Sequence, residues 1–295
     1  MYESFYELTC RPFSKTPDPR FLFLGTRHEE ALARLEYAVL EKELVVLTGD
    51  VGCGKTTVSR ALMDSLSMDS HEVITLLNPR LTPAQFLRTL ARRLGVEEDR
   101  FHKEDLLEAI YGRIYDLYGL GRTPVIIIDE AQLISGRGTF EEIRLLTNFQ
   151  LDDANLVSVV LIGQPDLARK LKQAAQKPLR QRIGMQYHLG PLLPGEIKPY
   201  VLHRLAVAGR EAPLFEDEAI DTLYRYSGGV PRLINNLASN ALLEGFIREV
   251  GTIHADIVLN VARDFELLPQ SVSGRSDDSW LERSGQEYSH KGGPE

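Results

Sequence analysis

Short apolar runs alternate with amphipathic stretches through the first two thirds of the chain. The apolar runs have the length and residue types of buried strands, and they cover 44–48, 73–77, 125–128 and 156–162. Between them, hydrophobic residues recur at helical spacing, which predicts helices over 28–43, 55–66, 82–94, 103–118 and 140–149. Strands that alternate with helices form a parallel sheet sandwiched by helices. The pattern therefore predicts an α/β domain over residues 27–190.

The strand pattern stops after residue 190. Amphipathic helices are predicted over 196–208, 216–226, 231–248 and 254–265, and together they predict a small all-helical domain over residues 191–267. Residues 1–26 are rich in proline and aromatic side chains, which excludes a continuous helix and indicates a segment packed onto a domain. Residues 268–295 are rich in serine, glycine and charge, and we expect a disordered tail there.

Composition and charge narrow the choice of compartment and partner. The 34 basic and 42 acidic side chains give a formal net charge of −8, which argues against a protein whose main task is to coat nucleic acid. The two cysteines, Cys10 and Cys53, form no metal-type cluster and fit a reducing compartment. The N-terminus lacks the pattern of a secretory signal, and no apolar run is long enough to span a bilayer. We therefore expect a cytoplasmic protein.

A glycine-rich loop follows the first predicted strand. Residues 49–56 have the sequence G-D-V-G-C-G-K-T, which fits the phosphate-binding pattern G-x-x-x-x-G-K-[ST]. Glycines let the backbone N–H groups turn toward phosphate oxygens, Lys55 would reach the β- and γ-phosphates, and the Thr56 hydroxyl would ligate Mg²⁺. The strand before the loop and the helix after it argue against a chance match. We expect ATP to contact Gly49, Asp50, Val51, Gly52, Cys53, Gly54, Lys55, Thr56 and Thr57.

Two acidic residues, Asp129 and Glu130, follow the buried strand 125–128. The carboxyl ends of strands in an open α/β sheet are where ligands bind. Asp129 would hold Mg²⁺ through its hydration shell, and Glu130 would polarise the attacking water. The alternative is that Asp129 caps the next turn and Glu130 is solvated. Beside a phosphate-binding loop, the pair favours hydrolysis of ATP.

Further polar positions are candidates for contact with the γ-phosphate. Gln164 follows the strand 156–162, although a turn formed by Gly-Gln-Pro explains it equally well. Arg180 and Arg182 follow a predicted helix, and either would suit an arginine finger offered to a neighbouring subunit, with ordinary surface arginines as the alternative. Arg232 lies in the first turn of a predicted helix, from which it would reach back to ATP.

These features, in this order, resemble the AAA+ superfamily of P-loop NTPases, in which the helical domain forms a lid. Within it, the chain is similar to ATPases of the general secretion pathway protein A type, which are related to transposition ATPases of the TniB and TnsC kind. The resemblance covers residues 1 to about 265, and a few motifs carry it. They are YESFY at 2–6, RPFS at 11–14, TPDPRFL at 16–22, HEEAL at 28–32, LTG at 47–49, DEAQ at 129–132, IGQP at 162–165, QRI at 181–183 and GGVPRLIN at 228–235.

The resemblance implies roles and partners for this chain. It makes Gln164 sensor 1, Arg182 the arginine finger ahead of Arg180, and Arg232 sensor 2, and it places residues 13–21 beside the adenine. It also implies a ring or filament oligomer with ATP between subunits, and a partner protein in a secretion system. Secretion-type members commonly continue into a transmembrane helix and a cell-wall-binding domain. This sequence shows no such span, so we expect any membrane association to be peripheral, at the inner membrane through a partner.

Two other functions are open at this stage. One is a DNA-associated regulator of transposition, which predicts a basic strip built from Arg88, Arg92 and Arg93 or from Arg169, Lys170 and Lys172. Solvated helix faces explain these side chains as well, and the net charge of −8 favours that explanation. The other is a nucleotide switch that binds ATP with negligible turnover.

Overall fold

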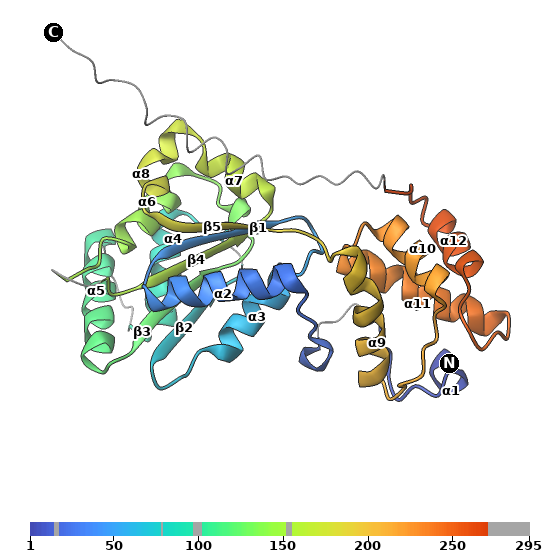
Figure 1. Ribbon diagram of the computed structural model, residues 1–295. Helices are drawn as coiled ribbons and strands as arrows, with labels where there is room; N and C mark the ends of the chain where they lie inside the picture. The colour runs from blue at the N-terminus through green and yellow to red at the C-terminus, as the bar shows by residue number, and fades with distance from the viewer. Residues whose placement is uncertain (15–17, 78, 97–101, 152–154, 271–295) are drawn as a thin grey trace, which may run out of the picture.

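A single parallel sheet organises the larger domain of the protein. The computed structural model describes residues 1–14, 18–77, 79–96, 102–151 and 155–270 (Figure 1). Within them, five strands form one parallel sheet in the order β2-β3-β4-β1-β5. The strands are β1 (Leu44–Gly49), β2 (His71–Leu76), β3 (Thr123–Ile128), β4 (Ser158–Gly163) and β5 (Ile183–Leu189). The predicted α/β fold class is confirmed.

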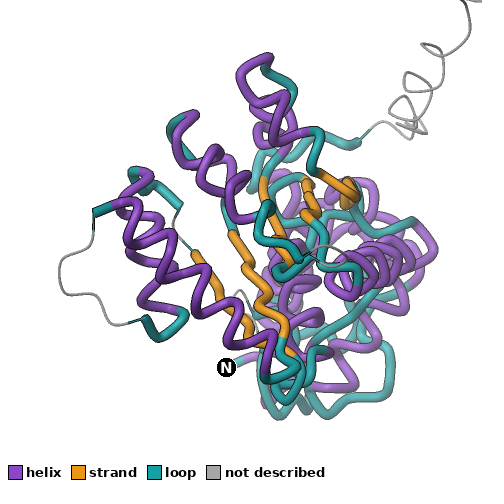
Figure 2. The backbone as a smooth tube through the Cα atoms, turned by 90° about the vertical axis from the view of Figure 1, so that its left-hand side faces the viewer, coloured by secondary structure: helices purple, strands orange, loops and turns teal. Residues whose placement is uncertain are grey.

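Helices cover both faces of this sheet, and Figure 2 shows the strands between them. One face carries α2 (Thr26–Leu40) and α3 (Lys55–Ser65). The other carries α4 (Pro83–Arg93), α5 (Lys103–Gly119), α6 (Arg137–Leu146), α7 (Pro165–Leu171) and α8 (Lys177–Arg180), with the 3₁₀ turns η2 (Ala131–Leu133) and η3 (Ala174–Gln176) between them. The start of α4 follows from its sequence: Thr82 and Gln85 form a capping box, and Pro83 occupies the first turn.

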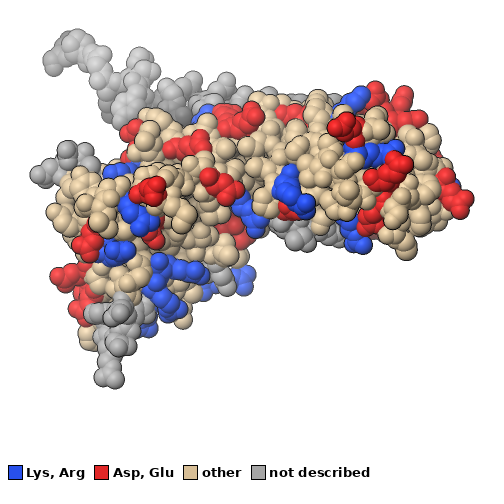
Figure 3. All heavy atoms as spheres, turned by 90° about the horizontal axis from the view of Figure 1, so that it is seen from below, with Lys and Arg blue, Asp and Glu red and all other residues tan. Residues whose placement is uncertain are grey.

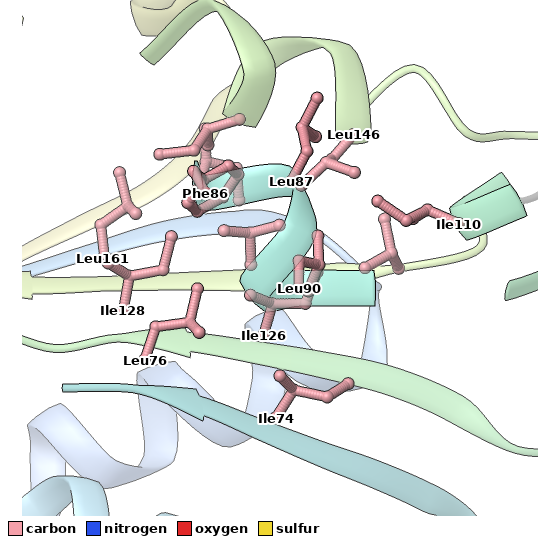
Figure 4. Packing of buried hydrophobic residues seen from close by; sticks show 14 of the residues in the cluster. Ile74, Leu76, Phe86, Leu87, Leu90, Ile110, Ile126, Ile128, Leu146 and Leu161 are labelled. Atoms are coloured by element: carbon pink, nitrogen blue, oxygen red, sulfur yellow. The ribbon is translucent and has the colours of Figure 1, made fainter. Parts of the chain in front are cut away.

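The period of two along each strand divides the core into two layers. Val46, Ile74, Ile126 and Leu161 face α4, α5 and α6, in the cluster that Figure 4 shows. The intervening residues Val45, Leu47, Val125, Ile127, Val160 and Ile162 face α2 and α3. Because both faces are covered, the central strands are apolar at nearly every position, which is the pattern that the sequence displays.

The C-terminal domain is all helical. It consists of η4 (Pro194–Glu196), α9 (Ile197–Val207), α10 (Asp217–Ser227), α11 (Pro231–Ile247) and α12 (Ala255–Asp264). The four α-helices share one hydrophobic cluster. Gly228, in the left-handed conformation with φ of 58°, ends α10, and Pro231 begins α11 three residues later. The predicted small helical domain is confirmed. We call it the lid, because it lies against the end of the sheet that carries the glycine-rich loop.

The described residues among the first 24 pack against the lid rather than against the sheet. The segment contains α1 (Tyr2–Phe5) and the 3₁₀ turn η1 (Pro19–Phe21), and Figure 1 shows the N-terminus beside the lid helices. Tyr6, Leu8 and Phe13 are buried in the hydrophobic cluster of the lid. The Tyr6 hydroxyl donates to the carbonyl oxygen of Val250 (3.1 Å), and Phe13 meets Phe215 edge-to-face at 6.0 Å. The expected packing of this segment onto a domain thus involves the lid core.

One element of the α/β domain differs from the sequence-based expectation. The strand β5 was not predicted, since only continuous apolar runs were taken as strands. It lies at the edge of the sheet beside β1, and its residues alternate between partly buried and exposed. The helix before Arg180 was predicted without bounds; the structure places α7 there, and Pro165 at its first turn is a start signal. Among the described residues, no helix combines the length and the apolar character needed to cross a membrane.

Candidate nucleotide site

A cavity of about 720 Å³ lies between the α/β domain and the lid. Its walls come from the N-terminal segment, the first turn of α2, the glycine-rich loop with α3, the ends of β3 and β4, the segment at Leu192, α9 and α11. Gly52, Gly54, Thr56 and Thr57 line it from one side, and Arg232 lines it from the lid. The cavity therefore gathers most of the residues that the sequence analysis expected to contact nucleotide.

The glycine-rich loop has the backbone conformation that its sequence requires. Gly52 and Gly54 have φ of 86° and 98°, a region that favours glycine. A Cβ at Gly52 would lie 2.7 Å from the Cβ of Arg232, so the lid approaches the loop closely. No side chain caps the first turn of α3, where Gly54 is the N-cap. Uncapped N–H groups at a helix N-terminus form an anion-binding site.

Lys55 is buried, and its ammonium group bonds to the loop itself. The Nζ atom donates to the carbonyl oxygens of Gly49 (2.8 Å) and Asp50 (2.9 Å). Burial lowers the pKa of Lys55, while the neighbouring Cys53, Glu130 and Asp129 act in the opposite direction. Phosphate oxygens entering the loop would compete with these two carbonyls for the ammonium group.

Cys53 contributes to the loop mainly through its backbone. Its side chain is buried, and burial raises the pKa of the thiol to about 11. The thiol is therefore protonated near neutral pH and unreactive.

The carboxyl end of β3 places Glu130 at the wall of the cavity, whereas Asp129, just before it, is not among the residues that line the cavity. Burial raises the pKa of Asp129, although its Oδ1 accepts the Glu130 N–H at 2.8 Å. Glu130 lines the cavity and has a φ of 52°, which is rare for a residue with a side chain. Such conformations cost about 1–3 kcal/mol and cluster at functional sites.

Gln132 joins the ends of β3 and β4, and the sequence analysis gave it no role. Its Nε2 donates to Glu130 Oε2 at 2.5 Å, and its Oε1 accepts the N–H of Gln164 at 3.0 Å. The Gln164 side chain also donates to Glu130 Oε2, at 3.4 Å. Two side-chain amides thus donate hydrogen bonds to one oxygen of Glu130. Gln132 itself is buried, with 7% of its surface exposed. Its place in the DEAQ motif two residues after Glu130 was the signal available in the sequence.

The three candidate arginines lie in two different places. Arg232 lines the cavity, and its backbone N–H approaches the Gly52 carbonyl oxygen at 3.4 Å. Arg180 and Arg182 are exposed and do not line the cavity. They lie at the end of α8 and just before β5, so either could act only on a site outside its own cavity, as an arginine finger does.

The N-terminal segment forms the outer wall of the cavity. Asp18, Pro19 and Phe21 line it, which agrees with part of the expectation for residues 13–21. Phe13 does not line the cavity, because it is only 2% exposed and packs into the lid core. Residues 15–17 of this expectation lie outside the described part of the chain. From the lid, Tyr200, Arg204 and Asn235 complete the wall, and none of them was singled out from the sequence.

Two crossings of the chain connect the α/β domain to the lid, one at residues 24–27 and one at 190–196. Glu196 ties them together: its Oε1 accepts the N–H (2.7 Å) and the hydroxyl (2.8 Å) of Thr26, and its Oε2 accepts the Leu193 N–H at 2.8 Å. Arg27 adds a bond from Nη1 to the Pro191 carbonyl oxygen (3.2 Å). The first turn of α2, which has no side-chain cap of its own, is thus capped by the second crossing.

Comparison with known sequences places this site in a family. Residues 39–171 match the model of the AAA domain. The chain is 40% identical over 283 residues to general secretion pathway protein A of Aeromonas hydrophila, a match that covers 95% of the chain. The chain spans about half the length of that relative, because the match covers 50% of the relative's sequence.

Solved structures share the fold of this chain. The Aeropyrum pernix ORC2 protein in its ADPNP–ADP complexes superimposes with a TM-score of 0.61 at 15% identity, covering 86% of this chain and 71% of that one. Drosophila ORC bound to DNA gives a TM-score of 0.65 at 18% identity, with 90% and 66% covered. At these identities the likeness shows the fold alone. The chain thus has the AAA+ P-loop NTPase fold, contains a match to the AAA domain, and is similar over half of the relative's length to general secretion pathway protein A.

Proposed function

We propose that the chain binds ATP with Mg²⁺ in the cavity between its domains and hydrolyses it. One arrangement carries the proposal: Lys55, Thr56, Glu130, Gln164 and Arg232 line the same cavity, although they come from the glycine-rich loop, the ends of two strands and the lid. A cavity that joins an uncapped helix N-terminus, a cation and an oriented carboxylate suits a bound triphosphate and an attacking water.

The residues present fit a magnesium ion. The Thr56 hydroxyl and the Asp129 carboxylate are oxygen ligands, which Mg²⁺ prefers. In the described ranges, no group of three or more His, Cys, Asp or Glu residues could hold a metal ion by itself. This fits an ion that takes its other ligands from phosphate oxygens and water. When bound, the ion would neutralise charge on the phosphates.

The protein's own groups would bind the phosphates and position the attacking water. The backbone N–H groups of the loop and the Lys55 ammonium would bind the phosphates, and Arg232 would reach them from the lid. Gln132 and Gln164 hold Oε2 of Glu130, which leaves its Oε1 to orient a water molecule and to accept a proton from it. Gln164 would also sense the γ-phosphate, because it bonds to the carboxylate that positions the water.

We further propose that the protein acts as an oligomer that drives or regulates assembly of a secretion system. The exposed Arg180 and Arg182, remote from their own cavity, support completion of each site by a neighbouring subunit. The similarity to general secretion pathway protein A supports the process.

Association with DNA is the alternative, and part of the predicted basic strip is already engaged within the chain. Lys170 donates to the carbonyl oxygens of Gln132 and Ile134, and Arg169 pairs with Asp166. Arg88, Arg92 and Arg93 are exposed on α4. Figure 3 shows that basic and acidic side chains are mixed on the face seen from below, with some basic ones gathered over the α/β domain. We therefore rank this alternative second.

The test is the rate of ATP hydrolysis against protein concentration, with and without duplex DNA. Glu130→Gln should retain ATP binding and lose at least about 100-fold in rate, the usual contribution of a general base. Glu108→Gln is the matched control, because Glu108 is exposed on α5. A specific rate that rises with concentration supports a site shared between subunits. Stimulation by DNA would favour the transposition-type alternative.

One outcome would refute hydrolysis while leaving nucleotide binding intact. If wild type and Glu130→Gln bind ATP equally and neither turns it over at any concentration, with or without DNA, the protein is a nucleotide switch.

A further inference from the structure

His28 lies between the lid crossings and the glycine-rich loop, and the proposed function gives it no role. It belongs to the first turn of α2 and is only 2% exposed. Its ring lines the nucleotide cavity beside Gly54. The Nε2 atom lies 2.8 Å from the carbonyl oxygen of Cys53, in the middle of the loop. This buried bond therefore constrains the orientation of the backbone of the phosphate-binding loop.

The bond fixes the tautomer of the ring. A carbonyl oxygen can only accept, so Nε2 carries the proton and donates. The other nitrogen, Nδ1, is buried and has no hydrogen-bond partner among the described residues. Burial lowers the pKa of His28, the Cys53 bond and Glu196 oppose this change, and Arg27 adds to it. The ring is therefore a neutral donor at Nε2, with no acceptor available for a second proton.

Several carbonyls of the loop accept hydrogen bonds from described groups. Gly49 and Asp50 accept from Lys55, Gly52 from the Arg232 N–H, and Gly54 from the Val58 N–H. Cys53 accepts from His28. In a trans peptide the C=O and the next N–H point in opposite directions. A Cys53 carbonyl that faces His28 therefore turns the Gly54 N–H away from His28, toward the inside of the loop.

This peptide needs an external anchor because glycine follows it. Gly54 has a φ of 98°, and glycine lets the preceding peptide plane rotate at little cost. A Cβ at Gly54 would lie 2.6 Å from His28 Nε2, so glycine is also what admits the ring. We propose that His28 is a positioning residue for phosphate binding: its Nε2–H holds the Cys53–Gly54 peptide so that the Gly54 N–H faces the phosphates of ATP. This inference rests on the proposed nucleotide site.

The test compares a variant that cannot donate with one that can. In His28→Leu the ring donor is lost, whereas in His28→Gln the side-chain amide nitrogen lies about as far from the backbone as Nε2. A buried carbonyl left without a donor costs enough to weaken ATP binding about tenfold in His28→Leu. We expect His28→Gln to recover most of the affinity. His254→Leu, at a partly exposed position of the lid, should bind like wild type.

The titrations use ATP·Mg²⁺ with each protein, and thermal unfolding without nucleotide reports whether each variant folds. Rescue by glutamine separates positioning from simple filling of space, because leucine fills the space as well. Equal affinities of wild type and His28→Leu would overturn the proposal, and so would equal losses in the leucine and glutamine variants. If wild type itself does not bind ATP, the proposed function fails instead. A nucleotide-free readout is the ¹⁵N shift of the ring, which should report protonated Nε2 and unprotonated Nδ1.

Discussion

Glu196 ties the two chain crossings between the α/β domain and the lid, and replacing it with glutamine measures the strength of that tie. The carboxylate accepts three hydrogen bonds, two on Oε1 from Thr26 and one on Oε2 from Leu193. A glutamine side chain offers one acceptor oxygen. If that oxygen accepts the hydrogen bonds of Thr26, the NH₂ group faces the Leu193 N–H. Both of these groups are donors, so no hydrogen bond forms between them.

The expected loss follows from these contacts. Hydrogen bonds to a charged group contribute about 1.5–3 kcal/mol, and the charge at the N-terminus of α2 adds about 0.3–1 kcal/mol. Because Glu196 is half-buried, water replaces part of what is lost, and we expect the free energy of unfolding to fall by about 2 kcal/mol in Glu196→Gln. For a chain of this size, such a loss lowers the midpoint of thermal unfolding by roughly 3–4 °C.

The loss should also depend on pH. Burial of the Glu196 carboxyl raises its pKa, but the bonds from Leu193 and Thr26 outweigh burial, and the net pKa lies below the ordinary 4.5. A carboxyl with a depressed folded-state pKa stabilises the protein above its unfolded pKa, and this stabilisation is lost as pH falls through the folded value. The difference between wild type and Glu196→Gln should therefore be full above pH 4.5 and shrink below it.

The assay is thermal unfolding of wild type, Glu196→Gln and Glu211→Gln from pH 7 downward. Glu211 is exposed, so its variant controls for the loss of one surface charge. A difference of about 1 °C is well below the shift expected for Glu196→Gln. If Glu196→Gln melts within about 1 °C of Glu211→Gln at neutral pH, the hydrogen bonds of Glu196 contribute nothing and the reasoning is wrong.

Further predictions concern binding, the N-terminal wall and the core. Lys55→Met should weaken ATP binding about 100-fold in a titration, because phosphate contacts of an ammonium group are charge-assisted, and affinity close to wild type would contradict it. Arg204→Met removes the bond from Nε to the Pro12 carbonyl (2.6 Å) and should speed tryptic cleavage after Arg20, with cleavage in the lid as the reference. Phe86→Ala empties a fully buried position and should lower the free energy of unfolding by about 3–5 kcal/mol in denaturant, whereas a loss below about 1 kcal/mol would show that the site collapses.

The sequence predicts the sheet well where strands are buried on both faces. Continuous apolar runs mark β1, β3 and β4, since no position along them meets water. The edge strand β5 has only one neighbour, and its sequence I-G-M-Q-Y-H-L alternates with hydrophobic residues on one side. Alternation over seven residues is a weaker signal than a continuous run, and the glycine at position 184 weakens it further.

The sequence likewise predicts only part of the candidate site. The glycine-rich loop and the Asp-Glu pair were expected because their chemistry requires adjacent residues of fixed type. Gln132 and His28 act on groups that belong to other segments, and their roles depend on how α2, β3 and β4 come together. The same holds for the N-terminal aromatics. Their burial in the lid depends on contacts as distant in sequence as Tyr6 and Val250, which no local pattern reports.

That distant contact has a consequence for the order of events during synthesis. The lid core needs Tyr6, Leu8 and Phe13, which leave the ribosome before the sheet does, and α11 and α12, which leave it after the sheet. The Tyr6–Val250 bond spans 244 residues, so closing this loop waits until almost the whole described chain has been translated. Until then, the N-terminal aromatic side chains are exposed without their partners, while the sheet between them can already form. During this interval the nascent chain presents the surface on which a chaperone would act.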